Sequence, residues 1–216
     1  MDFKQLAAKL FRDDHLFDPI GYGRIFAVVD FANVRYWAKS FWPEDNKEFI
    51  KRGIDIEKLA NLIDTVSPER KFFYYGYYKE HPELPYEHEN NVRYRKSIYR
   101  LDKAAKCGFT KRAKEIKEIS DFNDEGKYIG KKSKCNCDVE IAMDLLLKID
   151  KYDTVFAWTG DSDFNSLFQH LKSKKKKIIS VCARDFASEE LRKNSDLFIP
   201  ADPFAERLEY VRKPSK

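Results

Sequence analysis

The sequence predicts an α/β fold with a mainly parallel central sheet. Short apolar runs that favour strands alternate with amphipathic helical patterns from residue 24 to about residue 200, and a parallel sheet with right-handed crossovers produces this alternation. Two of the apolar runs lead to an aspartate, directly to Asp30 in one case and through Thr159-Gly160 to Asp161 in the other. Open α/β sheets hold their sites at the carboxyl ends of their strands, so we expect a functional site there.

Length and composition suit a single folded domain. The chain has 216 residues, of which 43% are hydrophobic and 15% aromatic, and these values argue against disorder. Charged residues make up 36%, above the usual level of about a quarter, which predicts a densely ionic surface. No apolar run reaches the roughly 18 to 20 residues of a membrane span, and the N-terminal residues lack a signal-peptide pattern. We therefore expect a cytoplasmic protein without a membrane partner.

The predicted strands combine β-branched and aromatic residues between turn signals. The run at 72–78 is aromatic on both alternating faces, as expected of a strand that helices cover on both sides. The predicted strands are 24–29, 72–78, 110–120, 155–158, 178–182 and 198–199.

Amphipathic patterns predict the helices that cover the sheet. Asp55 can cap the first of them, and Asp138 is the expected N-cap of another, whose apolar residues form an inward stripe. The predicted helices are 56–66, 91–107, 139–149, 162–172 and 188–192.

Three segments complete the predicted organisation. Residues 1–23 are interpreted as an N-terminal extension with a short helical pattern, residues 24–201 as the domain, and residues 202–216 as a basic C-terminal tail. Residues 121–134 are rich in Gly, Asn and Lys and predict a loop whose mobility would suit substrate capture.

Two groups of potential metal ligands lack a convincing pattern. Cys135 and Cys137 have one residue between them and no second Cys or His pair nearby at zinc-finger spacing, so reduced thiols are the default. The loop at 79–90 holds two histidines and several acids. Because Pro82 and Pro85 exclude helical ligand spacing, we interpret it as a solvated excursion, with a metal site as the alternative.

The stretch Thr159–Phe164 contains the strongest candidate residues. Asp161 and Asp163 are two residues apart in a predicted loop, where two negative charges need a shared proton or a cation to relieve them. A divalent metal is the simplest solution. The alternative is a helix start, with Asp161 or Ser162 as N-cap and Asp163 favoured by the helix dipole.

Other acids can complete such a site. Asn33 follows Asp30 by three residues, so its amide could orient the Asp30 carboxylate or a metal-bound water, or simply cap a helix. Asp138 opens a predicted helix. Asp144 lies six residues further, too far around that helix to share a simple site with Asp138, and pairs naturally with Lys148. We expect Asn33, Asp144 and Ser162 beside the metal ligands rather than among them.

The basic residues are concentrated in one part of the chain. Residues 91–134 contain 14 lysines and arginines against 6 acids, a surplus larger than the net charge of +5. This asymmetry predicts a polyanionic partner, and a solvated basic helix face is the alternative. Aromatic residues beside Arg35 could stack on bases or merely pack. The candidate nucleic-acid contacts are Arg35, Trp37, Arg93, Arg95, Arg100, Lys131, Lys132 and Lys134.

Three motifs together resemble a known family. They are Asp30-Phe31-Ala32-Asn33, the stretch from Lys134 to Asp144, and Thr159–Phe164. In order and spacing they resemble the NYN domain family, and more closely the LabA-like branch of the PIN-like nuclease superfamily. The resemblance implies a Rossmann-like, PIN-like three-layer sandwich, an acidic cluster that binds magnesium or manganese, and hydrolysis of RNA.

Carried over by position, the resemblance makes Asp30, Asp138, Asp161 and Asp163 the metal ligands and catalytic residues, with Asn33 beside them and Asp144 as a commonly retained acid. One departure is the sequence Cys135-Asn136-Cys137, where the family often has small residues that include glycine.

These features predict a nuclease that uses Mg²⁺ or Mn²⁺ to hydrolyse single-stranded RNA. The expected partner is RNA, with another single-stranded nucleic acid as the alternative. The alternative is a catalytically silent RNA-binding or regulatory module that keeps the acids for stability. A phosphatase with Asp30 as covalent nucleophile ranks lower, because it would want an acid or hydroxyl where Ala32 stands. A homodimer is compatible with these predictions.

Overall fold

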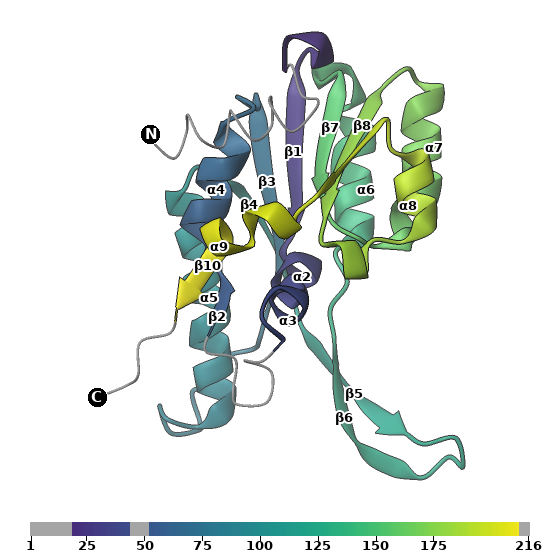
Figure 1. Cartoon of the computed structure of the whole chain (residues 1–216). Coiled ribbons are helices and arrows are strands. Elements are labelled where there is room, and N and C mark those ends of the chain that lie inside the picture. The colour runs from purple at the N-terminus through teal and green to yellow at the C-terminus, as the bar shows by residue number, and fades with distance from the viewer. Residues whose placement is uncertain (1–18, 44–51, 212–216) are drawn as a thin grey trace.

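The computed structural model describes residues 19–43 and 52–211. Its centre is a six-stranded sheet in which every neighbouring pair is parallel, with the order β4-β3-β1-β7-β8-β9 (Figure 1). This confirms the predicted fold class. The strands are β1 Ile25–Asp30, β3 Arg70–Tyr77, β4 Thr110–Glu115, β7 Thr154–Trp158, β8 Lys177–Cys182 and β9 Leu197–Pro200.

Helices cover both faces of the sheet, and short 3-10 turns join them to it. The helices are α2 Phe31–Val34, α3 Ala38–Phe41, α4 Ile56–Asp64, α5 Glu89–Lys106, α6 Asp138–Leu147, α7 Asn165–Ser173, α8 Glu189–Asn194 and α9 Ala205–Leu208. The 3-10 turns are η1 Pro19–Tyr22, η2 Arg35–Trp37, η4 Ile149–Lys151, η5 Ser162–Phe164, η6 Arg184–Phe186 and η7 Asp202–Phe204.

Alternation along the strands divides the core into two layers. Ile25, Ala27 and Val29 of β1 pack into the layer that contains buried residues of α4, α5 and α9. Phe26 and Val28 face the other way, into the layer formed with α6, α7 and α8. Strands with two buried faces are continuously apolar, which explains why the runs at β1, β7 and β8 lack polar alternation.

The topology positions a site between β1 and β7. From β1 the chain moves outward to β3 and β4, whereas from β7 it moves in the opposite direction to β8 and β9. The two adjacent strands therefore send their connections to opposite sides of the sheet. This reversal separates the loops that follow the two strands and makes the carboxyl ends of β1 and β7 the expected place for a ligand.

One segment differs from the prediction. Residues 121–134, expected to be a loop, belong to an antiparallel hairpin of β5 Lys117–Phe122 and β6 Tyr128–Lys134 (Figure 1). The run predicted as one strand at 110–120 contains β4 and the start of β5. The hairpin could not be predicted because neither of its faces packs on the core. Its sequence is therefore highly charged and lacks the alternating apolar pattern of a half-buried strand.

The C-terminal residues described by the structure pack against the domain. Phe204 and Leu208 are buried in the layer that contains α4, and β10 Glu209–Val211 pairs antiparallel with β2 Arg52–Ile54. The helical pattern expected near the N-terminus lies outside the described residues. Among the residues that are described, no helix combines the length and apolarity needed to cross a membrane.

Candidate metal centre

Three carboxylates meet at the carboxyl edge of the sheet. Asp30 ends β1, Asp161 follows β7, and Asp138 begins α6. One oxygen from each of these aspartates lies within 4.8 Å of the others. We call this group the acidic trio. Oxygen ligands at such separations suit a hard cation such as Mg²⁺ or Mn²⁺.

Asp30 is fixed by the helix that follows it. It is the N-cap of α2, and its Oδ1 accepts a hydrogen bond from the backbone N–H of Asn33 at 3.3 Å. Its side chain is almost completely buried. Burial raises the pKa of Asp30 to about 7, and the nearby negative charges of Asp138 and Asp161 also raise it. A bound cation would favour the ionised form that burial and like charge oppose.

Asn33 supports the site in a different way from the one expected. The backbone N–H of Asn33, and not its side-chain amide, holds the Asp30 carboxylate. The side-chain Oδ1 of Asn33 accepts hydrogen bonds from the backbone N–H of Gly160 at 3.0 Å and from Trp37 Nε1 at 3.1 Å. The amide thus ties the loop after β7 to the helical segment after β1, and it fixes the relative position of Asp30 and Asp161.

Gly160 is required by the tight path of that loop. A Cβ atom at this position would lie 2.3 Å from the backbone oxygen of Phe186 and 2.4 Å from Cys182 Sγ, so any side chain would force the loop away. Directly afterwards, Asp161 caps η5, and its Oδ1 accepts the backbone N–H of Asp163 at 3.0 Å. The cap predicted as the alternative to a metal ligand therefore coexists with membership of the acidic trio.

Asp138 does not cap its helix, and the prediction that it would do so was wrong. The N-cap position belongs to Cys137, and Asp138 is the first helical residue. Asn136 Oδ1 accepts the backbone N–H of Asp138 at 2.7 Å and so satisfies one free donor of the helix end. Burial, followed by the charges of Asp161 and Asp163, raises the pKa of Asp138. Its carboxylate lies close to those of Asp30 and Asp161.

Asp163 and Ser162 lie at the rim of this group. Both are exposed in η5, and Asp163 is not one of the three mutually close carboxylates. Its negative charge nevertheless reaches Asp138, whose pKa it helps to raise. The predicted fourth acid is therefore near the trio without being part of it.

Asp144 belongs to a separate ionic cluster. Its carboxylate accepts hydrogen bonds from Arg112 Nε at 2.7 Å and from the Tyr74 hydroxyl at 2.9 Å, and it pairs with Lys148 as expected. Partial burial opposes its ionisation, but the bonds from Arg112, Lys148 and Tyr74 hold its pKa at about 2. Arg112 and Tyr74 could not be predicted as partners, because both lie on strands far from Asp144 in the sequence.

The prediction that Trp37 contacts nucleic acid was wrong. Trp37 is fully buried, stacks on Trp158 with ring centroids 6.2 Å apart, and donates its Nε1 proton to Asn33. Its neighbour Tyr36 is the exposed aromatic instead, with Arg35 5.6 Å and Lys39 4.9 Å from its ring centroid. Only burial distinguishes these adjacent aromatics, and the local sequence does not encode it.

The predicted arginines of α5 all contact other parts of the protein. Arg93 pairs with Glu89 and with Glu118 of β5, the latter at 4.0 Å. Arg95 lies 3.5 Å from the Tyr86 ring centroid, and Arg100 lies 5.9 Å from that of Tyr75. Lys131, Lys132 and Lys134 are placed by their backbone on β6.

None of the four cysteines forms a disulfide bond. Cys107, Cys135, Cys137 and Cys182 are all free. A hydrogen bond with Cys135, together with burial, raises the pKa of the Cys137 thiol. A buried thiol of this kind is a poor nucleophile at neutral pH.

Comparison with known proteins agrees with this architecture. The curated Low amplitude and bright protein LabA of Synechococcus elongatus is 27% identical over 113 residues, which are 52% of this chain and 59% of that protein, so the match spans less than two thirds of LabA. A crystal structure of a protein of unknown function from Vibrio parahaemolyticus has the same fold, with a TM-score of 0.60 at 17% identity. The superposition covers 91% of this chain and 100% of the Vibrio chain.

The sequence model described as "NYN domain" matches residues 24–204. That range contains all three members of the acidic trio and the whole six-stranded sheet. Because the match covers most of the chain, the protein belongs to the NYN domain family, which is part of a nuclease-like superfamily.

Proposed function

We propose that the protein is a metal-dependent nuclease that hydrolyses phosphodiester bonds of single-stranded RNA. The acidic trio carries this proposal, because it gathers three carboxylates at the topological switch point of the sheet. Membership of the NYN domain family, whose domains are usually nucleases, supports the same reaction class.

In the proposed centre, Asp30, Asp138 and Asp161 hold Mg²⁺ or Mn²⁺, and Asp163 contributes from the rim. Such an ion, when bound, activates water and stabilises the charge that develops on the leaving oxygen. The protein contributes orientation. The α2 cap and the Asn33 amide hold two of the carboxylates in place before a substrate arrives.

A covalent mechanism has less support at this site. The Cys137 thiol is buried with a raised pKa, which disfavours the thiolate. Asp30 is followed two residues later by Ala32, which offers no acid or hydroxyl to assist a phospho-aspartyl intermediate. Direct attack by water therefore fits the available side chains best.

Charge and one exposed ring support the proposed substrate class. Arg35 and Lys39 flank the exposed Tyr36 on the segment that begins at Asp30, and Lys114 lies beside α6, paired with Glu140 at 2.8 Å. Cations beside an exposed aromatic suit a flexible strand whose bases can leave the stack.

The decisive experiment uses the wild type and Asp161→Asn with end-labelled single-stranded RNA and DNA, in Mn²⁺, Mg²⁺ or chelator. We expect wild-type RNA cleavage that requires metal, and no cleavage by D161N at an unchanged melting temperature in chelator. Equal cleavage by the two purified proteins would overturn the proposal.

A catalytically silent RNA-binding module is the second candidate. The observation in its favour is that two of the three acids also have a structural role, since Asp30 caps α2 and Asp161 caps η5. Calorimetric titration with Mn²⁺ separates the two candidates. Saturable binding that D161N weakens supports the nuclease, whereas RNA binding without any metal binding supports the silent module.

A further inference from the structure

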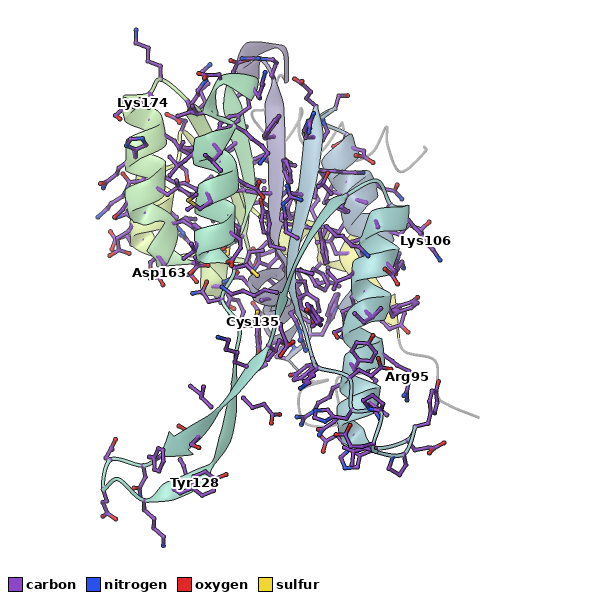
Figure 2. The ribbon with its side chains drawn as sticks, turned by 180° about the vertical axis from the view of Figure 1, so that it is seen from behind. Arg95, Lys106, Tyr128, Cys135, Asp163 and Lys174 are labelled. Atoms are coloured by element: carbon purple, nitrogen blue, oxygen red, sulfur yellow. The ribbon has the colours of Figure 1, made fainter. Side chains whose placement is uncertain are left out.

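The β5–β6 hairpin is an arm that leaves the domain beside the acidic trio. Just before β5, the backbone N–H of Ile116 donates a hydrogen bond to the carbonyl of Tyr77 at the end of β3, at 2.7 Å. After β6, only three residues separate the arm from Asp138. Figure 2 shows Cys135 at the root of the arm, Tyr128 toward its far end, and Asp163 on the same edge of the domain. The arm is therefore covalently joined to the candidate metal centre.

In the described part of the chain, β5 and β6 pair only with each other. A two-stranded hairpin is at best marginally stable alone, because it has no second layer in which to bury its side chains. This arm also exposes four large hydrophobic residues, Ile119, Phe122, Tyr128 and Ile129. Exposed apolar groups in such a position mark an interaction surface.

Two of these residues form an aromatic pair near the turn. Phe122 and Tyr128 are opposite each other across the ladder, 56% and 54% exposed, with ring centroids 5.8 Å apart and planes at 70°. The turn beside them is ordered by Asn123, whose Oδ1 accepts the backbone N–H groups of Glu125 and Lys127 at 3.2 and 2.8 Å. The rings are thus presented to solvent by a defined turn.

The charge of the arm changes along its length, because residues 121–127 at its turn hold three acids and one lysine. The returning strand carries lysines at positions 131, 132 and 134, between the aromatic pair and Asp138. At the root, Glu118 contacts Arg93 of α5 at 4.0 Å, which connects the arm to the start of a basic helix. A ligand that follows the arm toward the metal centre thus meets exposed rings first and a lysine-rich strand next.

We propose that the arm captures single-stranded RNA, with bases stacking on Phe122 and Tyr128 and the phosphate backbone running along β6 toward the acidic trio. This inference rests on the proposed function and specifies how that site holds its substrate. Aromatic rings accept any base, so the arm selects for unpaired strands rather than for sequence. A duplex buries the faces that the rings need.

The geometry also sets a length requirement. The six steps from Tyr128 to Lys134 span about 20 Å at ~3.3 Å per residue. A substrate must extend over that distance to occupy the aromatic pair and the metal centre together. Long RNA therefore benefits from the arm, whereas a dinucleotide or a small phosphodiester does not.

The test compares the wild type with the double variant Phe122→Ser/Tyr128→Ser. Binding of a fluorescent 20-nucleotide RNA is measured by anisotropy in chelator, where no cleavage occurs. We expect binding about tenfold weaker or more after loss of two stacking residues. The matched control is Tyr210→Ser, which removes an aromatic with 50% exposure from the other two-stranded ladder, β10–β2, and should leave binding unchanged.

A second pair of variants separates stacking from hairpin stability. Phe122→Trp/Tyr128→Trp keeps aromatic faces and should retain wild-type binding. Phe122→Leu/Tyr128→Leu keeps apolar bulk without aromatic faces and should bind as weakly as the serine variant. Wild-type binding by the leucine variant would overturn the stacking role, and so would wild-type binding by the serine variant.

Failure of the arm is distinguishable from failure of the nuclease. With Mn²⁺, the serine variant should cleave bis(4-nitrophenyl) phosphate at the wild-type rate but show a KM for the 20-nucleotide RNA raised about tenfold. If neither protein cleaves anything, hydrolysis is wrong, and the anisotropy result still decides the arm. Light scattering identifies the competing partner, because a wild-type dimer that the serine variant converts to a monomer would assign the arm to a second copy of the chain and overturn the proposal.

Discussion

Asp30 and Asp144 are acids of the same kind in opposite surroundings. Asp30 is buried beside two other carboxylates, and its pKa rises to about 7. Asp144 accepts hydrogen bonds from two cations and a tyrosine, and its pKa is held at about 2. Arg112 and Lys148 balance the charge of Asp144, whereas each acid of the trio has two further carboxylates beside it. The trio is therefore where we propose that an external cation would balance the charge.

The largest effect we expect separates the two acids by activity. Asp138→Asn should lower RNA cleavage in Mn²⁺ by more than about 100-fold, the upper end for residues that only support a ligand. Asp144→Asn should stay within about tenfold of the wild type at a temperature where it remains folded. Initial rates on labelled RNA check both variants. An equal loss in the two would show that the comparison between trio and ionic cluster does not describe the chemistry.

The second effect is on stability, where the Asp144 cluster, and not the acidic trio, should show the larger loss. Asp144→Asn leaves Arg112 and Lys148 without their carboxylate and should lower the free energy of unfolding at pH 7 by about 3 kcal/mol. Because the pKa of Asp144 is lowered, its stabilisation is complete above the ordinary pKa near 4 and disappears as the pH falls toward 2. Urea denaturation of both proteins at pH 7 and pH 3 should show the difference shrinking. A difference that stays constant with pH would contradict this assignment.

The third effect concerns Asp30, whose contribution to stability changes with pH in the opposite direction to that of Asp144. Its folded pKa is raised, so the metal-free fold binds more protons than the unfolded chain and loses stability as the pH rises from about 4 to above 7. Asp30→Asn should therefore stabilise the metal-free protein at pH 8 by on the order of 2 kcal/mol, and hardly at all at pH 4. Thermal melts in chelator measure this. Added Mn²⁺ should raise the melting temperature of the wild type but not that of D30N.

The smallest effect lies within the Asp144 cluster. Lys148 is one helical turn from Asp144, and such partly exposed i,i+4 pairs contribute only about 0.5 kcal/mol. Lys148→Met should therefore change stability far less than Asp144→Asn. If the lysine variant were as unstable as the aspartate variant, Lys148 rather than Arg112 would be the main partner of Asp144.

The sequence predicted the parts of the fold whose information is local. Continuous apolar runs located β1, β7 and β8, and their carboxyl ends located Asp30 and Asp161. The β5–β6 hairpin escaped prediction because neither of its faces is covered by the domain. Asp138 was identified by the family resemblance and its position before a helix, but its role as N-cap was wrong because Cys137 occupies that position.

Contacts between distant residues were the least predictable part of the site. The hydrogen bond that the Gly160 N–H donates to Asn33 joins positions 127 residues apart, and Arg112 contacts Asp144 across 32 residues. Trp37 and Tyr36 are neighbours in sequence, yet one is buried and the other exposed. Such contacts depend on how the layers pack together, which periodicity alone does not specify.

The Asn33 amide has a consequence for ion selectivity. Because its Oδ1 accepts hydrogen bonds from both Gly160 and Trp37, it holds the loop that carries Asp161 against the segment that follows Asp30. A preset separation favours small ions with strict octahedral geometry over Ca²⁺, which takes more ligands at longer distances. In the proposed metal centre, the size of the bound ion would thus depend on one neutral side chain that need not touch the ion.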